Sequence, residues 1–350
     1  MSGIPRLCLQ VRNVKRTLLA VVLCAWVLPC MGLTLSPDKR GAANAAIEKM
    51  IASDYDGALR LCDSITRSDA ADPLGWMLCL AAIGLHDLDL DSATDSLNFD
   101  GLFKKSSEVI IEYERRHGVS SYSLTVKGFV RATAAAYDLW RKRYFAGLDL
   151  GFDALARLQE AKKLDNSNTD VDFFLGLYTY ARAELKKAFW WAFFWYPGDK
   201  GEGIRSMRGC ARNAQFCRRA ASLALGEVYY REHRFAESDS VTADFSRLYP
   251  GSRLVKWTCA KRAESAGLWG PAGDYYRNLA DAYDSIPRAR RNSFLTRNKA
   301  AHMYFSAGNF AGARKECSTL LNRKAGYCDP FCRQLCDDTE RLLAKMSDAK

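Results

Sequence analysis

A 34-residue pattern recurs three times in the C-terminal part of this 350-residue chain, and it constrains the fold more than any other feature. When Arg219, Arg253 and Phe294 are each counted as position 1, positions 8 and 20 are small and position 17 is aromatic. The residues at positions 8, 17 and 20 are Gly226, Phe235 and Ser238, then Ala260, Trp269 and Ala272, then Ala301, Phe310 and Ala313. Repeats of this length are supersecondary units that bury their apolar faces by stacking on their neighbours.

The periodicity of apolar residues indicates that these units are helical. Ala221, Ala224, Leu225 and Val228 recur at i, i+3, i+4 and i+7, which places them on one helix face. No proline occurs between Pro73 and Pro197, a gap typical of helix-rich chains because proline breaks helices. No segment alternates long enough to predict a sheet, so the sequence predicts an all-α protein.

This pattern resembles the tetratricopeptide repeat family, in which antiparallel helix pairs stack into a right-handed α-solenoid. Counting from Lys39 gives a further match near the N-terminus, with Ala46 at position 8, Tyr55 at 17 and Ala58 at 20. Residues 126–187 are helical in character but do not keep the count. The resemblance implies N-terminal repeats over 33–106, diverged helical repeats over 107–218, three C-terminal repeats over 219–327 and a capping helix over 328–350.

Residues 1–32 have the features of a secretory signal peptide. Basic residues precede an apolar run, Leu18–Leu28, and small residues allow a cut after Gly32. Two alternatives are acylation of Cys30 as a lipoprotein and an uncleaved membrane anchor. Each alternative predicts export, with the body of the protein in the periplasm or cell envelope.

The resemblance also implies a partner-binding groove lined by the first helix of each repeat. The groove candidates are Glu227, Tyr230, Arg231, Trp257, Lys261, Glu264, Asn298, His302 and Phe305. Aromatic and mixed charged residues suit a protein or peptide partner. The basic excess over 201–350 favours an acidic or outer-membrane-associated partner, with a solvated basic face as the alternative. No nucleic-acid-reading motif is present.

Seven aromatic residues crowd an insertion at 189–197, between Phe189 and Tyr196. One interpretation is a core plug beneath the solenoid. The other is an edge that docks on a membrane surface or a partner, because Trp and Tyr favour such interfaces. The interface or anchor candidates are Trp190, Trp191, Phe194 and Trp195.

Three of the twelve cysteines lie in the leader, and in an oxidising compartment the remaining nine predict disulfides. The disulfide candidates are Cys62, Cys79, Cys210, Cys217, Cys317, Cys328, Cys332 and Cys336, with Cys259 expected as a free thiol. A zinc site near Cys328 is the less favoured alternative, because the usual knuckle spacing is absent.

Three acidic residues at alternate positions, Asp87, Asp89 and Asp91, followed by Asp95, give a weak match to a calcium loop. We expect solvated acids in an interhelix loop instead. The sequence contains no catalytic motif, and it predicts no metal and no cofactor.

These observations predict a non-catalytic protein–protein interaction scaffold of the cell envelope that binds its partner in the concave groove. The alternative is a membrane-peripheral or glycan-binding module, or an enzyme, that uses the aromatic insertion Phe189–Tyr196 as its platform.

Overall fold

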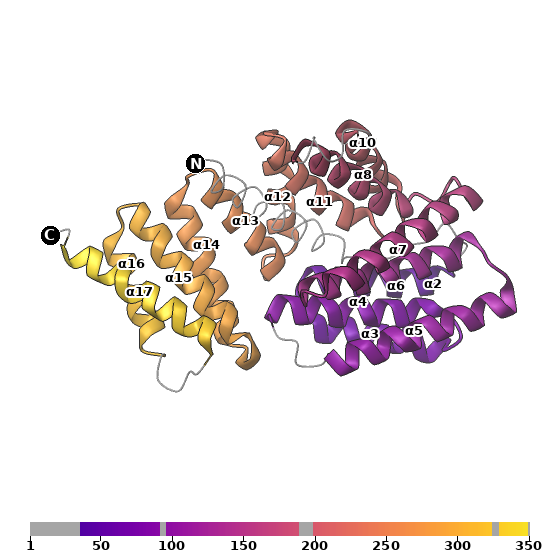
Figure 1. Ribbon diagram of the computed structural model, residues 1–350, viewed down its shortest axis with the longest axis horizontal. Helices are drawn as coiled ribbons and strands as arrows, with labels where there is room; N and C mark the ends of the chain where they lie inside the picture. Colours follow the sequence, from indigo (N-terminus) through magenta and orange to yellow (C-terminus); the bar gives the residue numbers. More distant parts are fainter. Residues whose placement is uncertain (1–35, 92–95, 189–198, 324–328, 349–350) are drawn as a thin grey trace. The chain divides into compact units, whose positions relative to one another are not determined.

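The structure of the protein is a computed structural model that describes residues 36–91, 96–188, 199–323 and 329–348. These residues form fifteen α-helices and one short 3-10 helix, with no strand among them, so the all-α prediction is confirmed. The leader, the aromatic insertion and Cys328 lie outside the described residues. In chain order the helices are α2 (Pro37–Ile51), α3 (Tyr55–Ser68), α4 (Pro73–Leu90), α5 (Ser96–His117), α6 (Ser121–Trp140), α7 (Tyr144–Leu164), α8 (Val171–Ala188), α10 (Lys200–Asn213), α11 (Arg218–Arg231), α12 (Phe235–Leu248), α13 (Arg253–Ser265), α14 (Trp269–Asp284), η1 (Pro287–Ala289), α15 (Arg290–Ser306), α16 (Phe310–Leu321) and α17 (Pro330–Asp348) (Figure 1).

Short polar side chains begin many of these helices. The side chains of Ser36, Asp54, Ser120, Ser252 and Asn309 each accept a hydrogen bond from the backbone N–H three residues further along. Such N-caps satisfy one of the donors that a helix start leaves without a partner. The sequence therefore fixes helix starts locally, before any packing is considered.

The helices pack mainly on their neighbours in the chain, as a repeat-like helical array. Pairs form between α2 and α3, α6 and α7, α8 and α10, α13 and α14, and α15 and α16. This arrangement of adjacent pairs is what the 34-residue pattern predicts at the level of helices.

Small residues lie where the paired helices cross, as the pattern requires. Ala260 and Ala272 are fully buried in the α13–α14 pair, and so are Ala301 and Ala313 in α15–α16. Between α11 and α12 the two positions touch directly, because the Ser238 hydroxyl donates a hydrogen bond to a backbone carbonyl of α11, that of Gly226. Positions 8 and 20 therefore bring the two helices close together.

The α6–α7 pair keeps the count of positions, although residues 126–187 were predicted to lose it. Counting from Gly128, Ala135 is position 8, Tyr144 is position 17 and Gly147 is position 20. A Cβ on Gly147 would stand 2.9 Å from the carbonyl oxygen of Ala135, so these two positions meet at the helix crossing. The expectation that this region loses the count is therefore wrong for α6–α7.

Position 15 of the helix pairs adopts a left-handed backbone. Its φ is +62° at Ser53, +64° at Lys142, +58° at His233, +71° at Gly267 and +74° at Gly308. This conformation ends the first helix and reverses the chain. Non-glycine residues occupy three of these turns, so the turn is imposed by the helix pair as well as by glycine.

The α8–α10 pair shows the same close crossing, separated by a longer connection. Cβ atoms built on Gly176 and Gly203 would each lie within 2.8 Å of the other residue's carbonyl oxygen. These glycines therefore take the places of positions 8 and 20, although they are 27 residues apart instead of 12. The aromatic insertion falls between the two helices of this pair.

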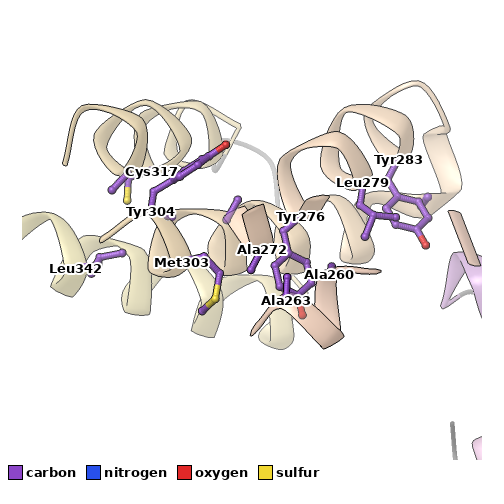
Figure 2. Packing of buried hydrophobic residues seen from close by; sticks show 14 of the residues in the cluster. Ala260, Ala263, Ala272, Tyr276, Leu279, Tyr283, Met303, Tyr304, Cys317 and Leu342 are labelled. Carbon is purple, nitrogen blue, oxygen red and sulfur yellow. The ribbon is translucent and has the colours of Figure 1, made fainter. Parts of the chain in front are cut away.

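Contacts divide the chain into two compact units. Unit 1 comprises Met1–His86 and Asp95–Val241, and unit 2 comprises Asp87–Thr94 and Thr242–Lys350. In unit 2 a buried cluster joins α13, α14, α15, α16 and α17. Figure 2 shows Ala260, Ala272 and Tyr276 packed together in this core, with Tyr304 and Cys317 further along it.

Among the described helices, α4 is the one long and apolar enough to cross a membrane by length and composition. Its mean hydropathy is 1.2, and 67% of its 18 residues are buried inside the protein. A helix that is mostly buried in this way has the properties of a core helix.

Two of the three alternate acids at the end of α4, Asp87 and Asp89, are not solvated loop residues, so the expectation is wrong for these two. Asp87 and Asp89 belong to the helix itself, and Asp87 is 1% exposed. The Asp89 carboxylate accepts hydrogen bonds from Arg253, at 2.7 Å, and from the hydroxyl of Tyr283, at 2.7 Å. All of these residues belong to unit 2, so Asp89 serves the packing of that unit.

Candidate functional site

The nine predicted groove residues fall on three helices. Glu227, Tyr230 and Arg231 lie on α11 in unit 1, and the other six lie on α13 and α15 in unit 2.

On α11 the three residues make contacts within their own helix pair. Arg231 forms an ion pair with Glu227 at 2.7 Å, one helical turn away. The ring of Tyr230 packs edge-on against Phe235, at position 17, with 5.5 Å between ring centroids. Phe305 of unit 2 makes the equivalent contact with Phe310 at 5.6 Å. Position 12 is therefore part of the turn between paired helices, a role that counting alone did not reveal.

Trp257 is held rigidly on α13. Its indole Nε1 donates a hydrogen bond to the hydroxyl of Tyr283 at 2.7 Å, and its ring meets Tyr276 edge-on at 5.7 Å. The ammonium of Lys261 lies 5.5 Å from the centroid of the Trp257 ring, within cation–π range. Burial and the neighbouring Asp89 raise the pKa of Tyr283, so its hydroxyl stays protonated.

Glu264, on the same helix as Trp257, makes contacts with α14 and α15. Lys299 lies 3.0 Å from both carboxylate oxygens of Glu264, and its ammonium stands 4.9 Å from the centroid of the Tyr276 ring. The Tyr276 hydroxyl also donates to Glu264. We call these five residues, Trp257, Lys261, Glu264, Tyr276 and Lys299, the Trp257 cluster. Tyr276 is fully buried, so the aromatic surface of the cluster is the partly buried ring of Trp257, which lies beside two ammonium groups and one carboxylate.

The C-terminal helix α17 occupies the space next to Asn298 and His302. Asn298 is 6% exposed, and its amide nitrogen donates to Asp338 at 3.0 Å and to Thr339 at 3.1 Å. His302 Nε2 lies 2.6 Å from the Asp338 carboxylate. Burial would raise the pKa of Asp338, but the hydrogen bonds from Asn298 and His302 outweigh burial and lower it. In this structure these two groove candidates are engaged by α17.

No two of the described cysteines lie at disulfide-bonding distance. The predicted bridges are therefore not present among Cys62, Cys79, Cys210, Cys217, Cys317, Cys332 and Cys336, and Cys328 lies outside the described residues. Cys62 and Cys79 do meet across α3 and α4, as their repeat positions predict. A hydrogen bond between their thiols raises the pKa of Cys62 and lowers that of Cys79.

Within the ranges that the structure describes, no group of three or more His, Cys, Asp or Glu side chains could hold a metal ion. The four interface or anchor candidates, Trp190, Trp191, Phe194 and Trp195, lie outside those ranges.

One cavity in unit 2 was not predicted from the sequence. It encloses about 430 Å³ where α14 ends and α15 begins, and its lining includes Asp284, Arg290, Ser293, Phe294 and Arg323. Ser293, Arg297 and Arg323 all donate hydrogen bonds to the Asp284 carboxylate. The basic run that starts at Arg288 is the only sequence signal near this cavity.

Comparison of the chain with models of protein families finds no matching family, and comparison with curated protein sequences finds no similar protein.

Proposed function

We propose that this chain is an exported, non-catalytic scaffold of tetratricopeptide-repeat type that binds a protein or peptide partner on the first-helix face of its repeats. The observation that carries the proposal is the repeated helix crossing through small residues, with a left-handed turn at position 15 between the two helices in five of the pairs. Stacked pairs of this kind form a right-handed solenoid, and solenoids use extended concave surfaces to bind partners.

The Trp257 cluster is the part of this face best suited to hold a partner. Trp257 is only partly buried, yet its indole N–H already donates a hydrogen bond to Tyr283. Binding a partner would therefore cost little further side-chain entropy at Trp257. Large, rigid aromatic residues next to basic side chains are typical of binding hot spots. Lys261 and Lys299 stand beside the rings of Trp257 and Tyr276. We therefore propose a peptide with an apolar anchor and an adjacent acidic group.

Export to the cell envelope is part of the proposal and rests on the leader at 1–32. It is supported by the basic residues ahead of the apolar run Leu18–Leu28, and by small residues that follow it. The envelope is therefore the compartment in which to search for the partner.

A photo-crosslinking amino acid at position 261, in place of Lys261, tests the proposal in the native envelope. The expected result is one dominant adduct, identified by mass spectrometry, that disappears when Trp257→Ala is added. The matched control is Trp269→Ala, which removes a tryptophan from the same unit at position 17 and should leave the adduct. If Trp257→Ala folds normally and the adduct persists, the partner does not bind this cluster.

A further inference from the structure

The cavity where α14 ends and α15 begins has the size and the lining of a small-molecule site. Its volume of about 430 Å³ falls within the range of about 300 to 1,000 Å³ that such sites occupy. Half of the residues that line it carry apolar or aromatic side chains, namely Tyr283, Ile286, Pro287 and Phe294. Apolar walls with a few converging polar groups are typical of sites that hold small molecules.

The walls of this cavity are held in place by the core of unit 2. Tyr283, labelled in Figure 2, and Phe294 are both buried. The Tyr283 hydroxyl donates a hydrogen bond to Asp89 and accepts one from the indole of Trp257, each at 2.7 Å. Because the protein itself fixes these side chains, the cavity is formed before a ligand arrives, and binding requires little reorganisation.

The carboxylate in the lining already has donors from the protein. The two oxygens of Asp284 accept hydrogen bonds from Ser293, Arg297 and Arg323. A cationic ligand would have to compete with two guanidinium groups for this carboxylate. The lining therefore does not favour a cation.

The donors that a ligand would meet belong to Arg290, on α15, and to Arg323, just after α16. Both side chains are exposed, whereas Ser293 and Phe294 are buried, so the two guanidinium groups stand at the mouth of the cavity. A guanidinium carries five N–H donors, and Arg323 uses its Nη1 for Asp284, which leaves further donors on the same group. Such forks match the paired oxygens of a carboxylate or a phosphate.

The first turn of α15 has a composition that does not favour helix stability. Its N-cap, Ala289, makes no side-chain hydrogen bond, and the turn contains Arg290 and Arg291 but no acidic residue. Positive charge at a helix N-terminus is unfavourable, because the helix dipole is positive there. Arg291 forms ion pairs with Asp91 and Asp329, whereas Arg290 lines the cavity. Such departures from local stability are expected at functional sites, and an anion in the cavity would offset the repulsion.

We propose that this cavity binds a small organic anion, with its carboxylate or phosphate held between Arg290 and Arg323. The apolar part of the ligand lies against Ile286, Pro287 and Phe294. No residue of the Trp257 cluster lines the cavity, so the site is independent of the function proposed above.

Isothermal titration calorimetry of the full chain tests the site with three probes that share one ring system. The probes 1-naphthoate and 1-naphthyl phosphate should bind with a dissociation constant of about 1 mM or tighter, as expected for ligands of this size. The tighter of the two identifies the preferred anion. The uncharged 1-naphthol should bind at least about tenfold more weakly, since it lacks the charge-assisted hydrogen bonds. Inorganic phosphate should also bind more weakly than 1-naphthyl phosphate, because it cannot contact the apolar wall.

Substitutions at the mouth of the cavity test the residues. Arg290→Gln should weaken binding of both anionic probes by about tenfold. The matched control is Arg288→Gln, which removes the same charge from the same turn, because Arg288 is exposed and does not line the cavity. It should leave both dissociation constants unchanged. Arg323 also supports Asp284, so Arg323→Lys, which keeps the charge and removes the fork, is the second variant and should weaken binding severalfold.

Four results would each overturn the proposal. The first is no binding of either anionic probe up to about 10 mM. The second is equal affinity for 1-naphthol, or for inorganic phosphate, which would mean that the anion and the apolar wall do not act together. The third is an equal effect of Arg288→Gln and Arg290→Gln, which would indicate general charge attraction. The fourth is loss of probe binding in Trp257→Ala with unchanged helix content, which would place the probes at the Trp257 cluster instead.

Discussion

Substituting Gly203 by alanine is the most direct test of the close helix crossing. Gly203 lies on α10 where it passes α8, and it has no room for a side chain. An added Cβ would stand 2.7 Å from the carbonyl oxygen of Gly176, 2.8 Å from the backbone nitrogen of Tyr180 and 2.9 Å from its Cβ. Backbone atoms cannot rotate away as the end of a long side chain can, so the two helices must separate.

The expected loss of stability is the difference between two opposing effects. Overpacking a tight core contact costs about 2 to 3 kcal/mol when the backbone has to shift. Alanine is a better helix former than glycine by about 1 kcal/mol, which acts in the opposite direction. Gly203→Ala should therefore lower the free energy of unfolding by about 1 to 2 kcal/mol.

A second glycine on the same helix provides the matched control. Gly209 has nothing within 4 Å of the place where a Cβ would be, so Gly209→Ala gains the helix preference without the clash. It should stabilise the protein by about 0.5 to 1 kcal/mol. At about 2 to 4 °C per kcal/mol for a unit of this size, the two variants should move the thermal midpoint in opposite directions.

Thermal unfolding followed by circular dichroism gives the answer for both variants under one set of conditions. Equal stabilisation by Gly203→Ala and Gly209→Ala would mean that the α8 and α10 backbones are not in close contact. The assignment of Gly176 and Gly203 to positions 8 and 20 would then be wrong, and so would the placement of the insertion within this helix pair.

Three further predictions concern unit 2 and the cysteines. Ala272→Leu should lower the thermal midpoint by overpacking the α13–α14 crossing, at a cost of about 1 to 3 kcal/mol; an unchanged midpoint would contradict the position count. Asp284→Asn should cost about 1 to 3 kcal/mol at pH 7. Burial would raise the pKa of Asp284, but the hydrogen bonds that it accepts lower it below 3.8. The carboxylate therefore stabilises the fold above that pH and loses its effect as the pH falls through the lowered pKa, so the urea unfolding curves of the variant and the parent should converge as the pH falls below that pKa. Alkylation of the native chain at pH 8 should label Cys79 before Cys332. The hydrogen bond with Cys62 lowers the pKa of the Cys79 thiol, whereas burial raises the pKa of Cys332 to about 12. Equal labelling of the two cysteines by peptide mass spectrometry would contradict this order.

The helical class and the three C-terminal helix pairs could be predicted because their signal is local. A small residue at position 8, a left-handed turn at 15 and a small residue at 20 act within about 20 residues of chain. Ala260 with Ala272, and Ala301 with Ala313, are fully buried as this reasoning requires. Each helix pair can be predicted from its own residues, without knowledge of the rest of the fold.

The same count of positions fails in the middle of the chain for two physical reasons. In α6–α7 only Ala135, Tyr144 and Gly147 keep the pattern, and the turn between them is Lys142, a residue that does not signal a left-handed backbone by its type. In α8–α10 the insertion stretches the interval between Gly176 and Gly203. The crossing survives because it depends on the absence of side chains there, and not on the length of the connection.

The candidate site was predicted less well than the fold, because position counting cannot see distant helices. Asn298 and His302 have groove positions within their own repeat, yet α17 packs against them through Asp338. Trp257 keeps a partly exposed ring, but its partner Tyr283 comes from the next helix. The count gives the face of a helix on which a residue lies, whereas tertiary packing decides whether that face is open.

The acidic residues at the end of α4 show how one pattern can hide three different roles. An i, i+2, i+4 spacing suggests a common loop, but on a helix it sends alternate side chains in different directions. Asp87 is buried, Asp89 holds Arg253 and Tyr283, and Asp91 forms a more exposed ion pair with Arg291 at 3.2 Å. Leu88 and Leu90 lie between these acids, and Leu90, the last residue of the helix, packs in the buried core cluster of unit 2. Because the Asp89 carboxylate accepts hydrogen bonds from a guanidinium and a hydroxyl of its own unit, this acidic residue serves helix packing.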